Sequence, residues 1–154
     1  SAQPPKAKDQ AALLVTARVK KWEKVQVPSN MTQKDFERLV LDSARSSGID
    51  TSKPFPFIVV GVITDYVWHV VTGTAKGDSA GVKHQQGHAS NRTFSGAKTK
   101  GKLVGFYSAG ELEGVISHPG ERFHVHYTDD DLKVSGHLDS FGVGKDAILL
   151  LPKE

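Results

Sequence analysis

Residues Phe123-His-Val-His-Tyr127, followed by Ser135-Gly-His137, form the stretch of sequence that decides the predicted fold. Successive side chains of a β-strand point to opposite faces, so a strand through the first segment places His124 and His126 on one face. Three acidic residues between the two segments, Asp129-Asp-Asp131, have the short polar side chains that tight turns favour. The pattern predicts a β-hairpin that turns within these acidic residues.

The predicted hairpin brings three histidines together. It places His137 opposite the first strand and close to His124, with His126 beside them. Three neutral imidazoles with an open fourth position are typical of a catalytic zinc site. A structural zinc site would usually be closed by cysteine, and the chain contains none. The sequence therefore predicts a zinc site at these three histidines, and another divalent metal would suit the same ligands.

Two other interpretations of the histidines stay open. Two outward histidines on an exposed strand can be solvated and bind no metal at all. A cupin-like site is a weaker rival, because its acidic ligand usually follows the HxH pair by a few residues. Asp130 stands there in place of the expected glutamate, and the turn explains Asp130 better.

Composition limits the size and partners of the protein. The 154 residues, of which 38% are apolar, suffice for one domain with a hydrophobic core and are too few for two large ones. The 20 basic and 17 acidic residues leave a net charge of only +3. The denser basic stretches, residues 6–24 and 98–102, do not interleave aromatic side chains that would stack on bases. We therefore expect no nucleic-acid partner.

The ends and the apolar runs suggest where the chain resides. No apolar run approaches the roughly 18 to 20 residues that cross a bilayer, so we expect no membrane span. The opening Ser1-Ala-Gln-Pro-Pro5 is typical of a terminus processed after a signal peptide, or of a remnant of cloning. We expect a periplasmic or secreted protein, with the cytoplasm as the alternative. Residues 1–10 are expected to form a flexible arm before a single domain at residues 11–154.

The first half of the chain predicts one helix between strands. Alternating apolar residues over 12–27 predict two short strands or one bent strand. Apolar residues at helical spacing predict a helix at residues 33–47, with Thr32 and Asp35 as a capping box and Gly48 as the stop. The apolar run 57–63 predicts a buried strand, joined to a second strand at 66–71 by a hairpin around Thr64-Asp65.

The second half predicts a loop and then further strands. Residues 72–102 contain few apolar side chains and predict a long loop. A strand at 102–107, a short helical turn at 108–114 and a final strand at 147–151 frame the histidine hairpin. Together the elements predict an α+β domain built on a mostly antiparallel sheet or half-barrel with one main helix.

Several segments resemble the acetolactate decarboxylases. Gly101-Lys-Leu-Val-Gly-Phe106, His118-Pro-Gly120, Phe123-His-Val-His-Tyr127 and Gly136-His137 occur in order. That family carries a G-T-L-V-G-F segment, a P-G-Y-H-L-H-F strand and a G-G-H after a short turn, with the same spacing between its three zinc-binding histidines. The resemblance covers residues 57–141 and implies an acetolactate-decarboxylase-like fold in which His124, His126 and His137 bind zinc.

The resemblance also implies a reaction and shows where this chain departs from it. In the family the metal chelates a 2-hydroxy-2-methyl-3-oxo acid, polarises its carbonyl and stabilises the enediolate left when carbon dioxide departs. A catalytic glutamate from the family's amino-terminal region has no counterpart before Phe57. At the carboxy terminus Glu154 is a poor substitute for a second acid. The family's arginine near the substrate aligns with His69.

Two residues are candidates for the missing catalytic groups. His69 faces opposite to both of its neighbours on the predicted strand and can point into the cavity of the metal, although a structural histidine is an equal alternative. Arg92 can bind a substrate carboxylate through its planar guanidinium, although surface arginines are more common. Other residues considered are better explained by loops, turns or exposed positions: His84, His88, Glu111, Glu113 and His118.

Three functions remain in competition. The first is a zinc-dependent enzyme, a decarboxylase or related lyase, that acts on a small 2-hydroxy-3-oxo acid. The second is a non-catalytic module that uses its metal to bind a small anionic ligand or a partner. The third is a structural domain whose histidines bind nothing. Exposed edge strands make a homodimer plausible.

Overall fold

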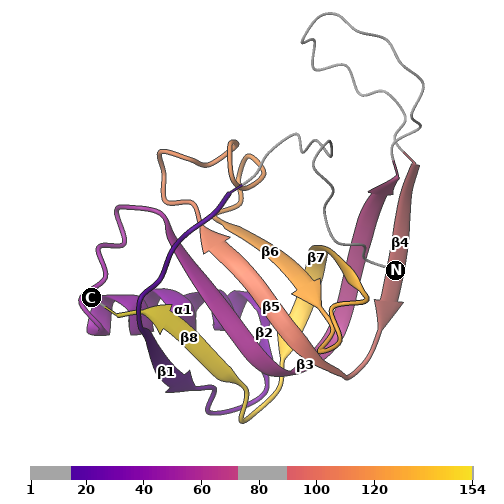
Figure 1. Ribbon diagram of the computed structural model, residues 1–154, viewed down its shortest axis with the longest axis horizontal. Helices are drawn as coiled ribbons and strands as arrows, with labels where there is room; N and C mark the ends of the chain where they lie inside the picture. The colour runs from indigo at the N-terminus through magenta and orange to yellow at the C-terminus, as the bar shows by residue number, and fades with distance from the viewer. Residues whose placement is uncertain (1–14, 73–89, 154) are drawn as a thin grey trace, which may run out of the picture.

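The computed structural model describes residues 15–72 and 90–153. It confirms the predicted α+β class, because its strands pair antiparallel in one sheet beside a single α-helix in the described residues. The arm predicted for residues 1–10 lies outside the described residues. The elements, in chain order, are β1 (Trp22–Gln26), β2 (Met31–Thr32), α1 (Gln33–Ser46), β3 (Phe55–Thr72), β4 (Ser90–Gly96), β5 (Thr99–Tyr107), β6 (Phe123–Thr128), β7 (Ser135–Val143) and β8 (Ile148–Pro152) (Figure 1).

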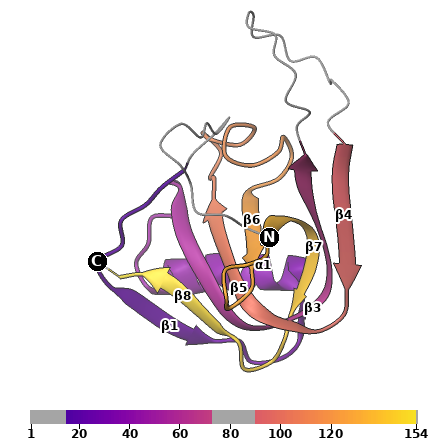
Figure 2. The ribbon, with the colours of Figure 1, turned by 45° about the vertical axis from the view of Figure 1, so that its right-hand side comes forward.

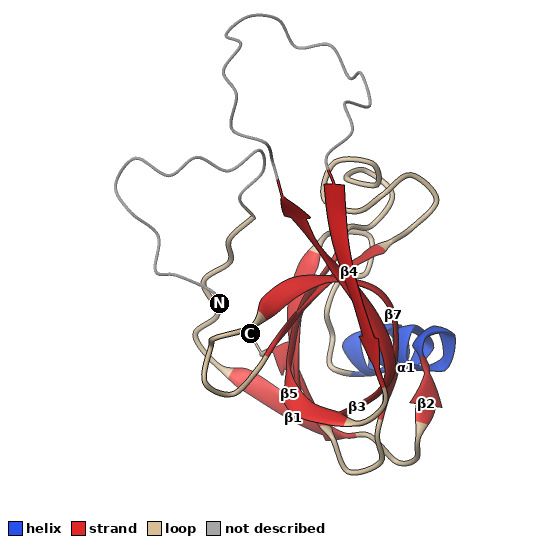
Figure 3. Ribbon diagram, turned by 90° about the vertical axis from the view of Figure 1, so that its right-hand side faces the viewer, coloured by secondary structure: helices blue, strands red, loops and turns tan. Residues whose placement is uncertain are grey.

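Four of the strands close into a narrow barrel. Strand β3 pairs with β5, β5 pairs with β6, β6 pairs with β7, and β7 returns to pair with β3. Figure 3 shows the rolled sheet with α1 lying against one side of it. Strands β8 and β1 extend the sheet from the first half of β3.

Strand β3 corrects one prediction from the sequence. The hairpin expected around Thr64-Asp65 is wrong, because residues 55–72 form a single strand of 18 residues. Asp65 has a φ of 45°, and the register with β7 shifts between Thr64 and Val67, so the strand bends sharply here without reversing. The first half of β3 pairs with β5 and the second half with β4 and β7, and the bend thus closes the barrel.

The long loop expected at residues 72–102 is also partly wrong. Residues 73–89 lie outside the described residues, but β4 and the start of β5 occupy the rest of this stretch. Strand β4 pairs with the second half of β3, and the two form a ribbon that projects beyond the other strands (Figure 2). Phe94 is the one large apolar side chain of β4, and its ring stacks on Trp68 at 4.4 Å between centroids. A strand that covers so little apolar surface lacks the pattern from which strands are predicted.

Helix α1 forms as its sequence predicts. The Thr32 side chain caps it by accepting a hydrogen bond from the backbone N–H of Asp35 at 3.3 Å, and Gly48 follows with a φ of 82°. Its buried face carries Phe36, Val40 and Ala44. Across the described ranges, no helix combines the length and apolar character needed to span a bilayer.

The strands predicted near the amino and carboxy termini agree with the structure to different extents. The final strand is confirmed as β8, whereas the amino-terminal strand begins only at Trp22, and residues 15–21 have no regular structure. The helical turn expected at residues 108–114 is wrong, because these residues form irregular turns and no helix. Buried serines anchor it: the Ser108 and Ser117 hydroxyl oxygens lie 2.9 Å apart.

The core lies between α1 and the inner face of the sheet and continues into the barrel. Phe36 contacts Phe57 and Phe141 with ring centroids 6.3 and 6.1 Å apart. Inside the barrel, the space is so narrow that aromatic rings lie directly against inward-facing glycines. The ring of Trp68 covers Gly136 in this way. Similar contacts join Tyr127 to Gly101 and Phe57 to Gly105.

We expect Gly136→Ala to destabilise the protein. A Cβ at this position would collide with the Trp68 ring and lie 2.8 Å from the backbone oxygen of His69. Overpacking of this kind costs about 1 to 3 kcal/mol in the free energy of unfolding, which urea denaturation measures. Gly110→Ala is the matched control, since a Cβ there meets no heavy atom within 4 Å. Equal losses in the two variants would contradict the packing described here.

Candidate metal centre

Strand alternation places the histidines on the outer face of the barrel. In β6, Val125 and Tyr127 are 3% and 6% exposed and point inward, so His124 and His126 point outward. His137 of β7 pairs directly with His126 across the hairpin. The predicted hairpin is therefore confirmed, and it gathers the three histidines on one face.

The turn of this hairpin is organised by Asp129. Its Oδ1 accepts hydrogen bonds from the backbone N–H groups of Lys133 at 2.7 Å and Val134 at 3.0 Å. Leu132, within the turn, has a φ of 58°. Asp130 is exposed in the same turn. Asp129 therefore fixes the register in which the two strands pair, and with it the position of His137 opposite His126.

The geometry of the three histidines suits one small cation. One ring nitrogen from each lies within 4.8 Å of the others, and the Nε2 atoms of His124 and His126 are 2.9 Å apart. The His137 ring centroid lies 4.7 Å from that of His124 and 5.5 Å from that of His126. Zinc binds imidazole nitrogen at about 2.0 to 2.1 Å, which places tetrahedral donors about 3.3 Å from each other. The three residues therefore fit such an ion.

Burial keeps the three imidazoles in the form that a metal requires. Partial burial, followed by the neighbouring histidines, lowers the pKa of His124 and of His137 to about 4. Burial, and then His69, also lowers the pKa of His126. Neutral imidazoles have free lone pairs at pH 7, so a cation need not compete with protons at these nitrogens.

His69 lies next to the three histidines and is fixed by an acid. It pairs in register with His137, and their ring centroids are 5.1 Å apart. Its Nδ1 lies 2.8 Å from Oδ1 of Asp139. Because a carboxylate only accepts hydrogen bonds, Nδ1 carries the proton and Nε2 is left to accept one. Asp139 was not predicted as a site residue, although its position two residues after His137 indicates that both side chains share a face.

His118 also lies beside the three histidines, and its position was not predicted. Its ring centroid is 5.3 Å from that of His137 and 6.4 Å from that of His124. The segment between β5 and β6 carries it over the outer face, and no strand pattern marks this segment in the sequence. The structure thus assembles five histidines, of which His69 and His118 flank the central three.

The other candidates lie elsewhere. Arg92 pairs with Val70 and sits with its guanidinium carbon 5.9 Å from the Phe94 ring centroid, so it points away from the face that holds His69. Its predicted catalytic role stays a prediction. Glu113 accepts a hydrogen bond from the Gly120 N–H at 2.8 Å and supports its own segment. Glu111 is exposed on this segment, and His84 and His88 lie outside the described residues.

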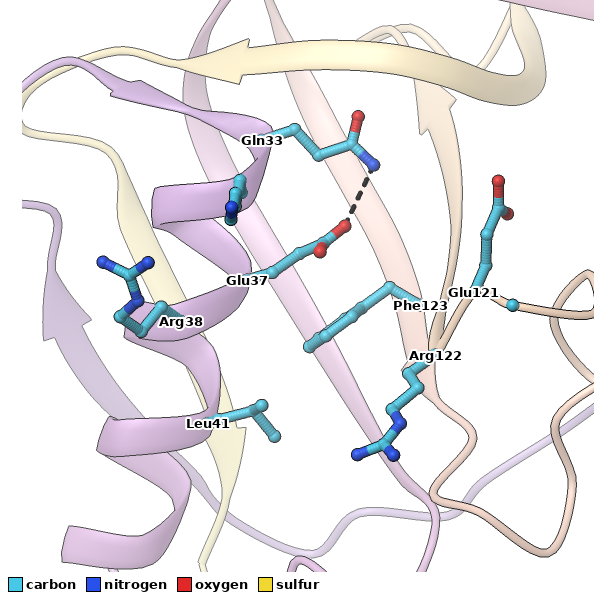
Figure 4. A pocket seen from close by; sticks show the side chains of 9 residues that line it. Gln33, Glu37, Arg38, Leu41, Glu121, Arg122 and Phe123 are labelled. Atoms are coloured by element: carbon cyan, nitrogen blue, oxygen red, sulfur yellow. Dashed lines mark hydrogen bonds between the residues drawn. The ribbon is translucent and has the colours of Figure 1, made fainter.

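A separate groove lies on the helix side of the sheet (Figure 4). It has a volume of about 470 Å³ between α1 and residues 120–123. Gln33 Nε2 donates to Glu37 Oε1 at 2.9 Å on its wall, and burial raises the pKa of Glu37. Phe123 points into this groove, and strand alternation directs His124 to the opposite face. The groove is therefore distinct from the histidine cluster.

A narrow antiparallel barrel with three imidazoles on its outer face defines a candidate metal-binding protein of the α+β class. The chain belongs to the alpha-acetolactate decarboxylase family, which matches residues 1–150. No curated protein sequence matches this chain.

Solved structures share this fold. The alpha-acetolactate decarboxylase of Bacillus subtilis strain 168 matches with a TM-score of 0.65 and 16% identity over 86% of this chain and 52% of that one. A Staphylococcus aureus protein of unknown function, similar to alpha-acetolactate decarboxylase, matches with a TM-score of 0.60 and 16% identity over 90% and 53% of the two chains. The chain spans about half the length of these relatives.

Acid is expected to destabilise the metal-free fold through His124 and His137. Their pKa is about 4 in the folded chain and about 6.5 in the unfolded chain. As the pH falls from about 6.5 to 4, the unfolded chain binds more protons than the folded chain, so the free energy of unfolding decreases. Above about pH 7 both states are neutral at these groups and the effect disappears.

Urea denaturation from pH 7.5 to 4 measures this dependence. The double variant His124→Gln, His137→Gln should lose less stability over this range than the unsubstituted chain, while carboxylates contribute equally to both and cancel in the difference. Parallel pH profiles would contradict the lowered pKa values.

Proposed function

We propose that this protein is a zinc-dependent, acetolactate-decarboxylase-like enzyme that acts on a small 2-hydroxy-3-oxo acid. The observation that carries the proposal is the convergence of His124, His126 and His137, with one ring nitrogen from each within 4.8 Å of the others. Membership of the alpha-acetolactate decarboxylase family supports the substrate class and the reaction. The chain that would carry out this reaction spans about half the length of its solved relatives.

The three central histidines are the proposed ligands. Their neutral state at pH 7 and their shared face favour a cation with a coordination position open to solvent. Zinc bound there would supply Lewis acidity for the carbonyl and hydroxyl oxygens of a 2-hydroxy-3-oxo acid. The protein contributes a rigid hairpin that holds the three nitrogens in place, because Asp129 and the strand register fix the two strands.

His69 is proposed to hold the substrate hydroxyl. Asp139 keeps the Nδ1 proton of His69, so Nε2 is the ring nitrogen that can accept a hydrogen bond or a proton. The His69 side chain is 16% exposed, and this partial burial limits competition from water. Asp139 does not need to touch the substrate, and we assign it the role of a positioning residue. Arg92 has no part in this proposed role, because its guanidinium lies against Phe94.

The alternative function is a non-catalytic module that binds a small anionic ligand at the same metal. Both functions require the metal, and they differ in whether carbon dioxide is released.

Elemental analysis and a decarboxylation assay with acetolactate, on one sample, test the proposal. We expect one zinc per chain and release of carbon dioxide, and we expect His124→Ala to lose both because it removes a ligand. Asp130→Asn is the matched control, since Asp130 is exposed in the turn and should leave zinc content and rate unchanged. Zinc without carbon dioxide release would favour the binding module, and zinc-free protein would reject both functions.

Asp139→Ala tests the positioning role. The variant should retain zinc while kcat/KM for acetolactate falls by on the order of 10-fold, because the His69 tautomer is no longer fixed. Nitrogen-15 NMR of the histidine side chains should show His69 changing from the Nδ1–H form to a mixture of tautomers. Ser140→Ala, at an exposed neighbouring position of β7, is the control. Unchanged kinetics and an unchanged tautomer in Asp139→Ala would refute this role.

A further inference from the structure

His118 lies beside His137 at a distance comparable to those within the central cluster, and somewhat farther from His124, at 6.4 Å between ring centroids. The 5.3 Å between the ring centroids of His118 and His137 is less than the 5.5 Å between those of His126 and His137. The His118 ring also stands at 89° to that of His137, so an edge of one ring meets the face of the other. No strand holds His118, which places a fourth imidazole at the margin of the metal centre on a separate segment.

The backbone around His118 is held firmly. The preceding residue, Ser117, is 5% exposed, and its hydroxyl contacts that of Ser108 and donates to the carbonyl of Glu121. On the other side, the backbone N–H of Glu121 donates to the carbonyl of His118 at 2.9 Å. The Gly120 N–H is held by Glu113. These contacts fix where the side chain begins while leaving the ring itself unconstrained.

His118 is exposed, and the hydrogen bonds found for it among the described residues involve its backbone alone. His69, the other flanking histidine, differs because Asp139 holds its Nδ1. Rotation about two side-chain torsions can therefore move a nitrogen of His118 relative to the central three at little cost. An imidazole that can rotate beside an open coordination position is a competing ligand for that position.

We propose that His118 is an exchangeable fourth ligand, which closes the metal site in the absence of substrate and yields its position to an anionic substrate. This inference rests on the proposed metal site at His124, His126 and His137. The exchange breaks one bond from an imidazole nitrogen to the metal and forms one from a carboxylate or hydroxyl oxygen of the substrate. The protein would thereby protect its metal from loss when no substrate is bound, at the cost of a weaker apparent affinity for anions.

Cobalt(II), which absorbs visible light, serves as the probe in the full chain and in His118→Ala. Competition with a chelator should show that the variant binds cobalt more weakly than the full chain, because a ligand is lost. Titration with azide, followed by the cobalt absorption, should show the opposite change. If His118 occupies the position half of the time, its removal weakens cobalt binding and tightens apparent azide binding by about twofold each, and by about tenfold each if it is bound nine tenths of the time.

Opposite changes in the affinity for metal and for anion distinguish ligand exchange from general damage to the site. Val115→Ala is the matched control, because Val115 lies on the same segment and is 57% exposed. If the full chain binds cobalt and His118→Ala matches it in both titrations, the role of His118 is refuted while the metal site stands. A full chain that binds no cobalt would instead overturn the metal site itself.

Discussion

Closure of the sheet by the bent strand β3 is the constraint on which the rest of the structure depends. One strand supplies both edges of the barrel, since its first half pairs with β5 and its second half with β7. Asp65, with a φ of 45°, provides the change of direction. A residue other than glycine adopts this conformation at some cost, which the hydrogen bonds of two further strand pairings offset. Without the bend, His69 would not lie opposite His137.

The barrel is narrow, and the residues of its strands alternate between its interior and its outer face. Four strands enclose little space, so inward positions alternate between aromatic rings and glycines such as Gly136. The same alternation sends every second residue of β6 and β7 outward, where polar side chains are tolerated. Partial burial, followed by the effect of the neighbouring histidines, then lowers the pKa of the outward His124 and His137. The alternation of side chains along each strand therefore determines both the packing of the interior and the chemistry of the outer face.

Features encoded by local pattern were predictable from the sequence. The helix follows from its apolar spacing and its Thr32 cap, and the histidine hairpin follows from strand alternation around an acidic turn. Features that depend on distant pairing were not predictable. The Thr64-Asp65 pair indicates a turn by its local sequence, because Asp is a favoured turn residue, and only the partners of β3 make it a bend. Strand β4 has a single large apolar residue, and His118 reaches the site through a segment of turns whose path is set by buried serines.

The three central histidines and His69 are held by different strand pairings of the fold. His124, His126 and His137 all lie within one hairpin, so their mutual distances depend on contacts close in sequence. His69 meets them across the seam where β3 rejoins β7, a contact that joins residues far apart along the chain. A transient opening of this seam would leave these three histidines assembled and carry His69 away from them. The three-histidine cluster and its alignment with His69 thus have separate structural origins, and each can be lost or adjusted without the other.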